Sequence, residues 1–219
     1  IGLGIPAEPL FRSASELNNV VRNVNKQILK YYQKDIKPEL DIDDIDEKDD
    51  VFKYAKFDSL TEKNDFIYID FPFEIFGSAK PMSKELPMLM NNWLSELTNY
   101  EEDEVEISFF SLDEEALTIQ SSYFFLSKIG TRVRKIVFPK DISEIKNDYD
   151  VVISGNKRVI DYFKDNDEVY TILIPNGTTS GCVATDEYDS LDNVIKDEKL
   201  LDKLQGFVNN KNNKNNVNG

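Results

Sequence analysis

Residues 150–174 read DVVISGNKRVIDYFKDNDEVYTILI, and this stretch decides the predicted fold. Its two ends, 150–154 and 169–174, are continuous apolar runs of strand length, whereas 156–165 has the spacing of a short helix. Strands that are apolar throughout are buried on both faces, as they are in parallel sheets covered by their connecting helices. The stretch therefore predicts a strand, a helix and a second strand parallel to the first.

The same alternation continues through much of the chain. Further strands are predicted at three places, FIYID at 66–70, VEISFFS at 105–111 and RVRKIVF at 132–138. Ser83, Asp113 and Ser190 have side chains that cap helices, and the helix after Asp113 is expected to end before Gly130. The sequence predicts an α/β fold of the Rossmann type, a mostly parallel sheet of about five strands with helices on both faces.

The first 60 residues predict a separate arm. Residues 13–16, SASE, form a capping-box pattern, after which apolar residues recur at helical spacing until Pro38. An amphipathic helix is therefore predicted over 14–35, followed by an acidic linker. The predicted organisation is a helical arm and acidic linker at 1–60, an α/β domain at 61–208 and a disordered Asn/Lys-rich tail at 209–219.

The charge of the chain limits its partners. The 219 residues include 26 Lys and Arg against 41 Asp and Glu, a formal net charge of −15. A surface this acidic repels phosphate backbones and anionic lipids, so neither a nucleic acid nor a membrane is predicted as a partner. No apolar run approaches the roughly 20 residues that cross a bilayer. A location in the cytoplasm or within a virion is predicted, because the start IGLGIPAEPLF lacks the basic residues of a signal peptide.

The side-chain inventory limits the chemistry. Histidine is absent and Cys182 is the only cysteine, which excludes histidine-dependent triads, Cys-His pairs and a disulfide within the chain. Catalysis would have to use carboxylates, lysines, hydroxyls or a metal held by oxygen. In open α/β sheets, ligands bind beyond the carboxyl ends of the strands. The residues predicted there are Asp70, Ser111, Lys140, Ser154, Gly155 and Asn156.

This order of strand ends resembles the haloacid dehalogenase (HAD) superfamily, and 105–175 looks most like its 5′-nucleotidase branch. The family's first motif is a hydrophobic strand followed by D-x-D-G-[TV], and IYIDFPFE at 67–74 is similar to it. The second motif is a strand that ends in Ser or Thr, as ISFFS does at Ser111. The third supplies a lysine, for which FPKD offers Lys140. The resemblance covers roughly 64–180 and implies a HAD-like fold.

The resemblance also implies roles for these residues. Asp70 would be the nucleophile, and Ser111 and Lys140 would hold the transferred phosphoryl oxygens. In the family, magnesium is held by the nucleophile, a backbone carbonyl and an acid after the fourth strand, which makes Asp70 and Asn156 the candidate ligands. The sequence departs from the family at Pro72, which replaces the general acid, and at the neutral run that replaces the fourth-strand acids. Proline transfers no proton, and neutral oxygens hold magnesium less well than carboxylates do.

Two functions are open on this basis. The first is a catalytically degenerate HAD-like domain that acts without a cofactor, as a protein-binding or structural subunit of a larger assembly, with the helix at 14–35 docking on a protein partner. The Asn, Lys, Ile and Asp usage suits an AT-rich genome such as that of a phage or another virus. The alternative is a divergent magnesium-dependent phosphatase or 5′-nucleotidase, in which Asp70 attacks phosphorus and Glu74 replaces the general acid.

Overall fold

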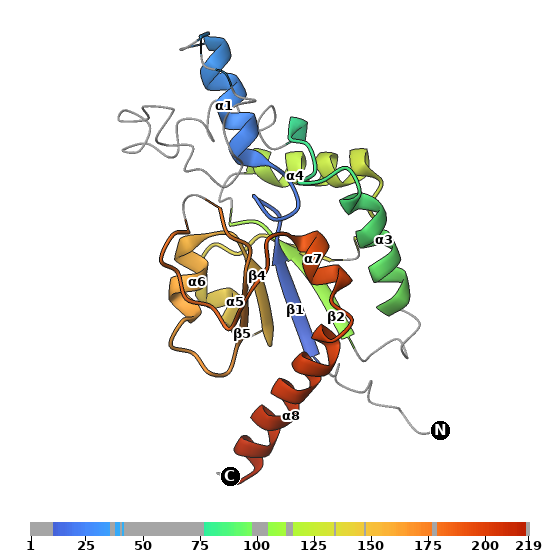
Figure 1. Ribbon diagram of the computed structural model, residues 1–219, viewed down its shortest axis with the longest axis vertical. Coiled ribbons are helices and arrows are strands. Elements are labelled where there is room, and N and C mark those ends of the chain that lie inside the picture. Colours follow the sequence, from blue (N-terminus) through green and yellow to red (C-terminus); the bar gives the residue numbers. More distant parts are fainter. Residues whose placement is uncertain are drawn as a thin grey trace.

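A parallel sheet of six strands forms the centre of the protein (Figure 1). The structure is a computed structural model that describes residues 11–35, 38–39, 41, 77–97, 105–112, 116–133, 135–146, 148–176 and 179–217. The strand order is β3-β2-β1-β4-β5-β6, and each neighbouring pair is parallel. The strands are β1 (Phe11–Glu16), β2 (Val105–Phe110), β3 (Ile136–Val137), β4 (Val151–Ser154), β5 (Tyr170–Leu173) and β6 (Asp186–Glu187).

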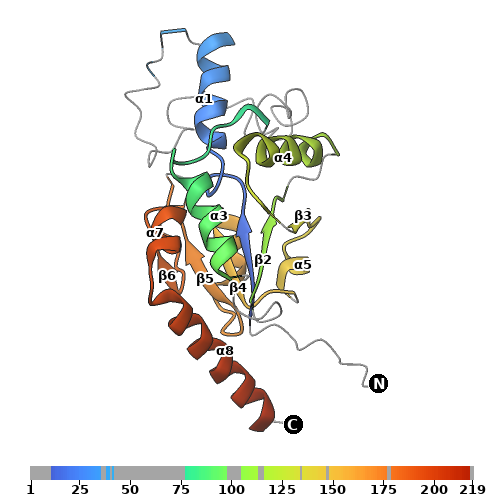
Figure 2. The same cartoon turned by 90° about the vertical axis from the view of Figure 1, so that its right-hand side faces the viewer.

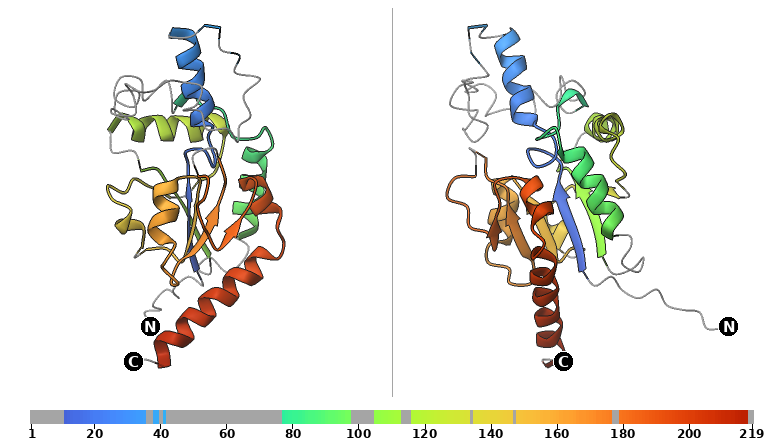
Figure 3. Two further views of the ribbon diagram at one scale, coloured as in Figure 1. Left: turned by 60° about the vertical axis from the view of Figure 1, so that its left-hand side comes forward. Right: turned by 45° about the vertical axis from the view of Figure 1, so that its right-hand side comes forward.

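Helices cover both faces of the sheet, as Figure 3 shows from two sides. Helices α3, α7 and α8 lie on one face and α5 and α6 on the other. Figure 2 shows α1 and α4 beyond the carboxyl ends of β1 and β2. The helices are α1 (Val24–Asp35), α3 (Leu86–Leu97), α4 (Ala116–Ile129), α5 (Ser143–Lys146), α6 (Lys157–Phe163), α7 (Leu191–Lys196) and α8 (Leu200–Val217).

Two hydrophobic cores lie on opposite faces of the sheet, because side chains alternate along each strand. In β4, Val151 and Ile153 belong to the core under α3, α7 and α8, whereas Val152 belongs to the core under α5 and α6. In β2, Phe109 and Phe110 divide between the two cores in the same way. The predicted α/β class, with a parallel sheet covered on both faces, is therefore confirmed.

The predicted helix over 14–35 is wrong for its first ten residues. Residues 11–16 form β1, which pairs with β2 at six positions and with β4 at three. The capping-box pattern at 13–16 is a local signal, and pairing on both sides of the strand outweighs it. Residues 11–16 are thus part of the α/β sheet and do not belong to a separate arm.

Helix α1 begins only at Val24. Asn23 precedes it, and its side-chain oxygen accepts a hydrogen bond from the Lys26 amide at 2.9 Å, which is how an N-cap residue satisfies a free helix amide. The apolar side chains Val24 and Ile28 are 1% and 4% exposed, so the chain itself covers them. Val24 and Ile28, which belong to the docking face predicted for a helix at 14–35, are therefore buried, and docking on a protein partner stays a prediction.

Several local predictions are confirmed. Ser83 accepts a hydrogen bond from the Leu86 amide at 3.0 Å at the start of α3. Helix α4 ends before Gly130, whose φ of +69° lies in the left-handed region that glycine tolerates. Ser190 caps α7 as predicted, whereas Asp113 lies outside the described residues. Asn156 caps α6, a cap that was not predicted from the sequence. The strand predicted at 66–70 lies outside the described residues, and β6 was not predicted.

The Asn/Lys-rich tail is helical rather than disordered as far as Val217, because α8 continues through it. Two lysines of this segment form ion pairs with the end of the sheet and with a neighbouring loop. The ammonium nitrogen of Lys211 lies 2.8 Å from a carboxylate oxygen of Asp150, and that of Lys214 lies 3.5 Å from a carboxylate oxygen of Asp167. The pair of Lys211 with the largely buried Asp150 ties the helix to the sheet, whereas the exposed pair of Lys214 with Asp167 contributes little. Among the described residues, no helix is both long and apolar enough to cross a bilayer.

A polar network holds the junction between α7 and α8 against β5 and β6. The hydroxyl of Tyr188 donates to Asp197 at 2.7 Å, and that of Tyr170 donates to Asp186 at 2.7 Å. Lys203 pairs with Asp186 at 3.2 Å. Burial, followed by the hydrogen bond to Asp197 and its charge, raises the pKa of Tyr188 to about 12. Burial and Asp186 raise the pKa of Tyr170 as well.

We expect this network to make the protein less stable at alkaline pH. An unfolded tyrosine has a pKa of about 10, so the folded state holds these protons more tightly. The corresponding stabilisation is fully present below pH 10 and is lost as the pH rises toward about 12, the pKa of Tyr188. Urea unfolding at pH 9 and pH 11.5 measures the loss. Tyr188→Phe should reduce it, whereas Tyr162→Phe, which changes an exposed ring of α6, should not.

Candidate functional site

The candidate site lies where the strand order reverses. The chain passes from β1 outward to β2 and β3, and then returns to β4 on the other side of β1. In open α/β sheets this reversal leaves a crevice at the carboxyl ends of the strands, where ligands bind. The ends that meet here are Glu16 of β1, Ser111 after β2, and Ser154 of β4 with Gly155 and Asn156 after it.

Glu16 links the two strands at the reversal. Its carboxylate oxygen Oε2 accepts a hydrogen bond from the Ser154 hydroxyl at 2.5 Å and another from the Gly155 amide at 3.2 Å. The residue is only 3% exposed, and Ser154 is fully buried. A buried carboxylate needs such donors, because burial of an unpaired charge is costly. Glu16 therefore joins the carboxyl ends of β1 and β4.

On the other side of β1, Arg22 connects the turn after the strand to β2. The backbone amide of Arg22 donates to the Leu17 carbonyl at 2.9 Å, which closes the turn. Its side chain donates from Nε to the Asn18 side-chain oxygen at 2.7 Å and from Nη2 to the Ser111 hydroxyl at 3.5 Å. The guanidinium also lies 5.9 Å from the centre of the Phe125 ring. Arg22 is fully buried, so it brings a positive charge into the interior next to the strand ends.

Asn18 completes this group. Its Nδ2 donates to the Ser111 hydroxyl at 3.4 Å while its Oδ1 accepts from Arg22. Ser111 is fully buried and receives both of these donors. Asn18, Arg22 and Ser111 therefore form one hydrogen-bonded cluster. Their polar atoms contact one another, which is the usual arrangement of buried polar groups in a stable core.

The β4 end of the site is tightly packed around Gly155. The Asn176 side chain donates to the Gly155 carbonyl at 2.6 Å, and the Asn156 amide donates to the Ser154 hydroxyl at 3.0 Å. A Cβ at position 155 would lie 3.0 Å from Asn176 Nδ2 and 3.2 Å from the Ile174 carbonyl oxygen. A side chain at position 155 would thus crowd the Asn176 side chain and the Ile174 backbone, which favours glycine there.

Gly155→Ala is expected to lower the free energy of unfolding by about 1–3 kcal/mol, because the added methyl group forces apart packed atoms. Gly206→Ala is the matched control, since a Cβ at position 206 of α8 meets nothing within 4 Å. That change should raise stability by about 0.5–1 kcal/mol through helix propensity. Urea unfolding measures both. An unchanged Gly155→Ala protein would show that this strand end has free space.

The structure brings together only some of the residues predicted from the sequence. Ser111 is in the buried cluster, and Asn156 lies at the reversal, where its Oδ1 accepts from the Arg158 amide at 2.9 Å and caps α6. Lys140 is exposed, and its side chain makes no hydrogen bond or ion pair with the residues that the structure describes. Asp70 lies outside the described residues, so its role stays a prediction.

Sequence reasoning missed Glu16, Asn18 and Arg22. Residues 16–20 read ELNNV, which has the spacing of the family's first motif after a strand, an acid, a polar residue two positions later and a valine two further on. That spacing was the available signal. Even so, Glu16 is one methylene longer than the expected aspartate, and Asn18 is neutral at the position of the second acid.

Solved structures similar to this chain include HAD-like hydrolases. One from Burkholderia xenovorans LB400 is 12% identical with a TM-score of 0.45, over 87% of this chain and 97% of that one. A dehalogenase with an intermediate complex is 9% identical with a TM-score of 0.48, over 86% of this chain and 96% of that one. A HAD-like family hydrolase from Xanthomonas campestris is 10% identical with a TM-score of 0.45, over 91% and 99%.

The names of these structures are those of haloacid dehalogenase-like hydrolases or of a dehalogenase, and the HAD superfamily is the one that the sequence resembles. The 5′-nucleotidase branch stays a prediction. The sequence matches no protein-family model and no curated protein.

The described strand ends do not suit the magnesium that the family resemblance implies. Magnesium prefers carboxylates and water in an octahedral shell. The carboxylate of Glu16 already accepts two hydrogen bonds, and the oxygen of Asn18 accepts from Arg22. Within the described part of the chain, no three acidic, histidine or cysteine side chains come close enough to hold a metal. A buried guanidinium at the same edge would also repel a dication.

Proposed function

We propose that this chain is a catalytically degenerate HAD-like domain that acts by binding, as a structural or protein-binding subunit of a larger assembly. The observation that supports this most is the state of Glu16. A carboxylate that attacks a substrate has to present a lone pair to it. The Glu16 carboxylate is 3% exposed and accepts hydrogen bonds from Ser154 and Gly155, so it acts as an internal link between two strands.

The cluster around Arg22 supports the same proposal. In a phosphoryl-transfer site, cationic and hydroxyl groups face the substrate and stabilise the charge that develops on it. Here Arg22 and Ser111 are fully buried, and the guanidinium donates to Asn18 and to Ser111 itself. These groups stabilise the carboxyl end of the sheet, and we propose that the domain has no resident magnesium.

A protein partner is proposed on the basis of charge. The net charge of −15 disfavours nucleic acids and anionic membranes. The composition, rich in Asn, Lys, Ile and Asp, makes an assembly of a phage or another virus the proposed setting. The proposal does not place the partner on α1, whose apolar residues Val24 and Ile28 are already covered.

The competing function is a magnesium-dependent phosphatase in which Asp70 is the nucleophile. Beryllofluoride mimics a phosphoryl group on a carboxylate, so ¹⁹F NMR of the protein with beryllofluoride and millimolar magnesium separates the two functions. We expect no protein-bound resonance. A bound resonance that disappears in Asp70→Asn, but persists in the control Asp167→Asn, would establish the phosphatase. A resonance that disappears in Glu16→Gln would show that the Glu16 carboxylate is reactive.

A further inference from the structure

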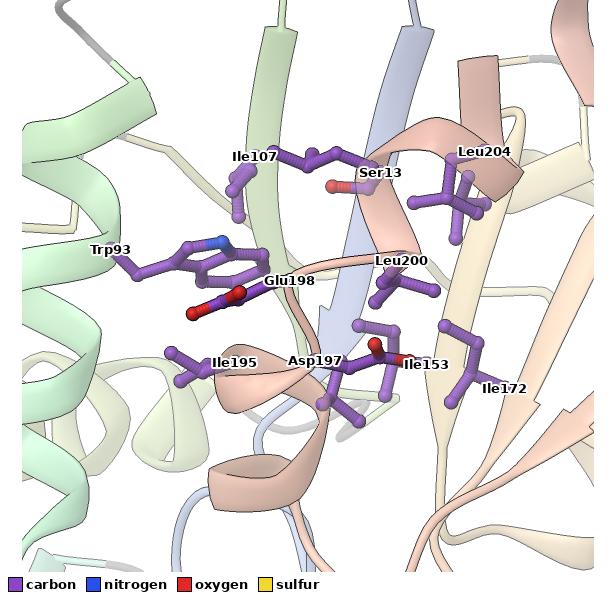
Figure 4. Close-up of a pocket in the computed structure, with 13 residues that line it drawn as sticks. Ser13, Trp93, Ile107, Ile153, Ile172, Ile195, Asp197, Glu198, Leu200 and Leu204 are labelled. Atoms are coloured by element: carbon purple, nitrogen blue, oxygen red, sulfur yellow. The ribbon is translucent and has the colours of Figure 1, made fainter. Parts of the chain in front are cut away.

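A cavity of about 250 Å³ lies between the sheet and the helices α3, α7 and α8 (Figure 4). Its floor is formed by buried strand residues, including Val151, Ile153 and Ile172. Its rim is formed by partly exposed residues of the helices, of which Trp93, Ile195 and Leu201 are half-buried and Glu198 is exposed. The cavity therefore has an apolar interior and opens toward solvent on the helix side.

This cavity is distinct from the strand-end site. Its residue from β1 is Ser13, which lies three positions before Glu16, or about 10 Å along a strand. None of the residues that line it belongs to the Glu16 link or to the Arg22 cluster. The cavity lies over the body of the sheet, whereas the candidate site lies at its carboxyl edge.

The ionisable side chains that line the cavity are acidic. Among the described residues of the lining these are Asp197 and Glu198, at the junction of α7 and α8. Asp197 accepts from Tyr188 and lies 3.9 Å from Lys203, so its charge is partly balanced. Glu198 makes no ion pair with any other described residue. An anionic ligand is disfavoured here, while a cationic group at the rim gains the attraction of Glu198.

Trp93 adds a second preference for cations. The indole ring lines the cavity on the α3 side (Figure 4). An ammonium group within about 6 Å of an indole face is attracted by the ring quadrupole. The cavity size is also informative, since an engineered apolar cavity of about 150 Å³ binds benzene. A space of about 250 Å³ thus accommodates one aromatic ring with a short side chain.

We propose that this cavity binds a small organic amine, with its apolar body against the isoleucines of β4 and β5 and its ammonium group at the rim beside Glu198 and Trp93. The apolar body supplies most of the binding free energy through removal of its surface from water. The carboxylate supplies selectivity for the charge of the ligand. This assignment does not depend on whether the strand-end site is catalytic.

Trp93 is the only tryptophan of the chain, so its fluorescence reports on the cavity directly. The full chain is titrated with three probes that share an aryl-alkyl body: phenethylamine, 2-phenylethanol and 3-phenylpropionate. We expect saturable changes in emission with phenethylamine at millimolar concentrations, binding that is about twofold to fivefold weaker for the alcohol, and weaker binding still for the carboxylate.

Two variants locate the effect. Glu198→Gln should remove most of the preference for the amine over the alcohol, whereas Glu168→Gln, which changes an exposed acid away from the cavity, should leave it unchanged. Ile195→Phe places a larger ring at the rim and should weaken all three probes. Equal or tighter binding of 3-phenylpropionate would overturn the proposed ligand class. Absence of any saturable response to the three probes would overturn the binding site itself.

Discussion

Glu16→Ala is expected to lower the free energy of unfolding by about 2–4 kcal/mol. The change removes the acceptor of two hydrogen bonds, and it leaves the buried Ser154 hydroxyl and Gly155 amide with unsatisfied donors. A hydrogen bond to a charged group contributes about 1.5–3 kcal/mol, and each orphaned buried donor costs about 1–3 kcal/mol. Urea unfolding followed by Trp93 fluorescence measures the loss.

Two further variants test the reason for this loss. Glu187→Ala is the matched control, since Glu187 also ends a parallel strand but is exposed, and it should change stability by less than about 0.5 kcal/mol. Glu16→Gln keeps an acceptor oxygen, so its free energy of unfolding should lie between that of wild type and that of Glu16→Ala. A Glu16→Ala protein as stable as wild type would show that the link between β1 and β4 contributes nothing.

Arg22→Ala is expected to destabilise the protein by about 3–5 kcal/mol. Arg22 is among the largest fully buried side chains in the described part of the chain. Its removal leaves a cavity, for which large-to-small core substitutions typically cost about 2–5 kcal/mol. It also removes the Nε group that donates a hydrogen bond to the Asn18 side-chain oxygen. The Ser111 hydroxyl loses one of the two hydrogen bonds that it accepts, the one from Arg22 Nη2. The same unfolding assay measures this effect.

A second variant separates the contribution of the planar guanidinium group from that of the side-chain volume. Arg22→Lys restores length and charge but not the planar group that reaches Asn18 and Ser111 together, so it should recover only part of the loss. Arg158→Ala changes an exposed arginine of α6 and should be close to neutral. If Arg22→Lys were as stable as wild type, the paired donation to Asn18 and Ser111 would be unimportant.

The parallel sheet was predictable, because two of its strands, β4 and β5, carry strong local signals. The apolar runs in β4 and β5 with a short helix between them have few other stable arrangements. Strand β1 carries no such signal. Its centre is Ser13, Ala14 and Ser15, small residues that do not favour a strand, and alanine favours helix. The conformation of β1 thus depends on pairing with β2 and β4. Partners distant in sequence therefore decided the central strand.

The candidate site was predictable to the same extent. Ser111 and Ser154 follow apolar strands, so the topology alone places them at one edge of the sheet. The sequence predicts Asp70 as the acid at that edge, because it ends the strand predicted at 66–70. The described structure places Glu16 at this edge, and Asp70 lies outside the described residues. Arg22 could not be identified, since the sequence gives no sign that this arginine is fully buried beside Asn18 and Ser111.

The most direct test of the degenerate site is phosphate release from p-nitrophenyl phosphate at millimolar magnesium, measured for wild type, Glu16→Gln and Asp70→Asn prepared in parallel. In the proposed function, the Glu16 carboxylate, which is 3% exposed and accepts hydrogen bonds from Ser154 and Gly155, links two strands and does not attack a substrate. The predicted result is no magnesium-dependent release above buffer for any of the three proteins. Release by wild type that either substitution abolishes would contradict the account and identify the nucleophile.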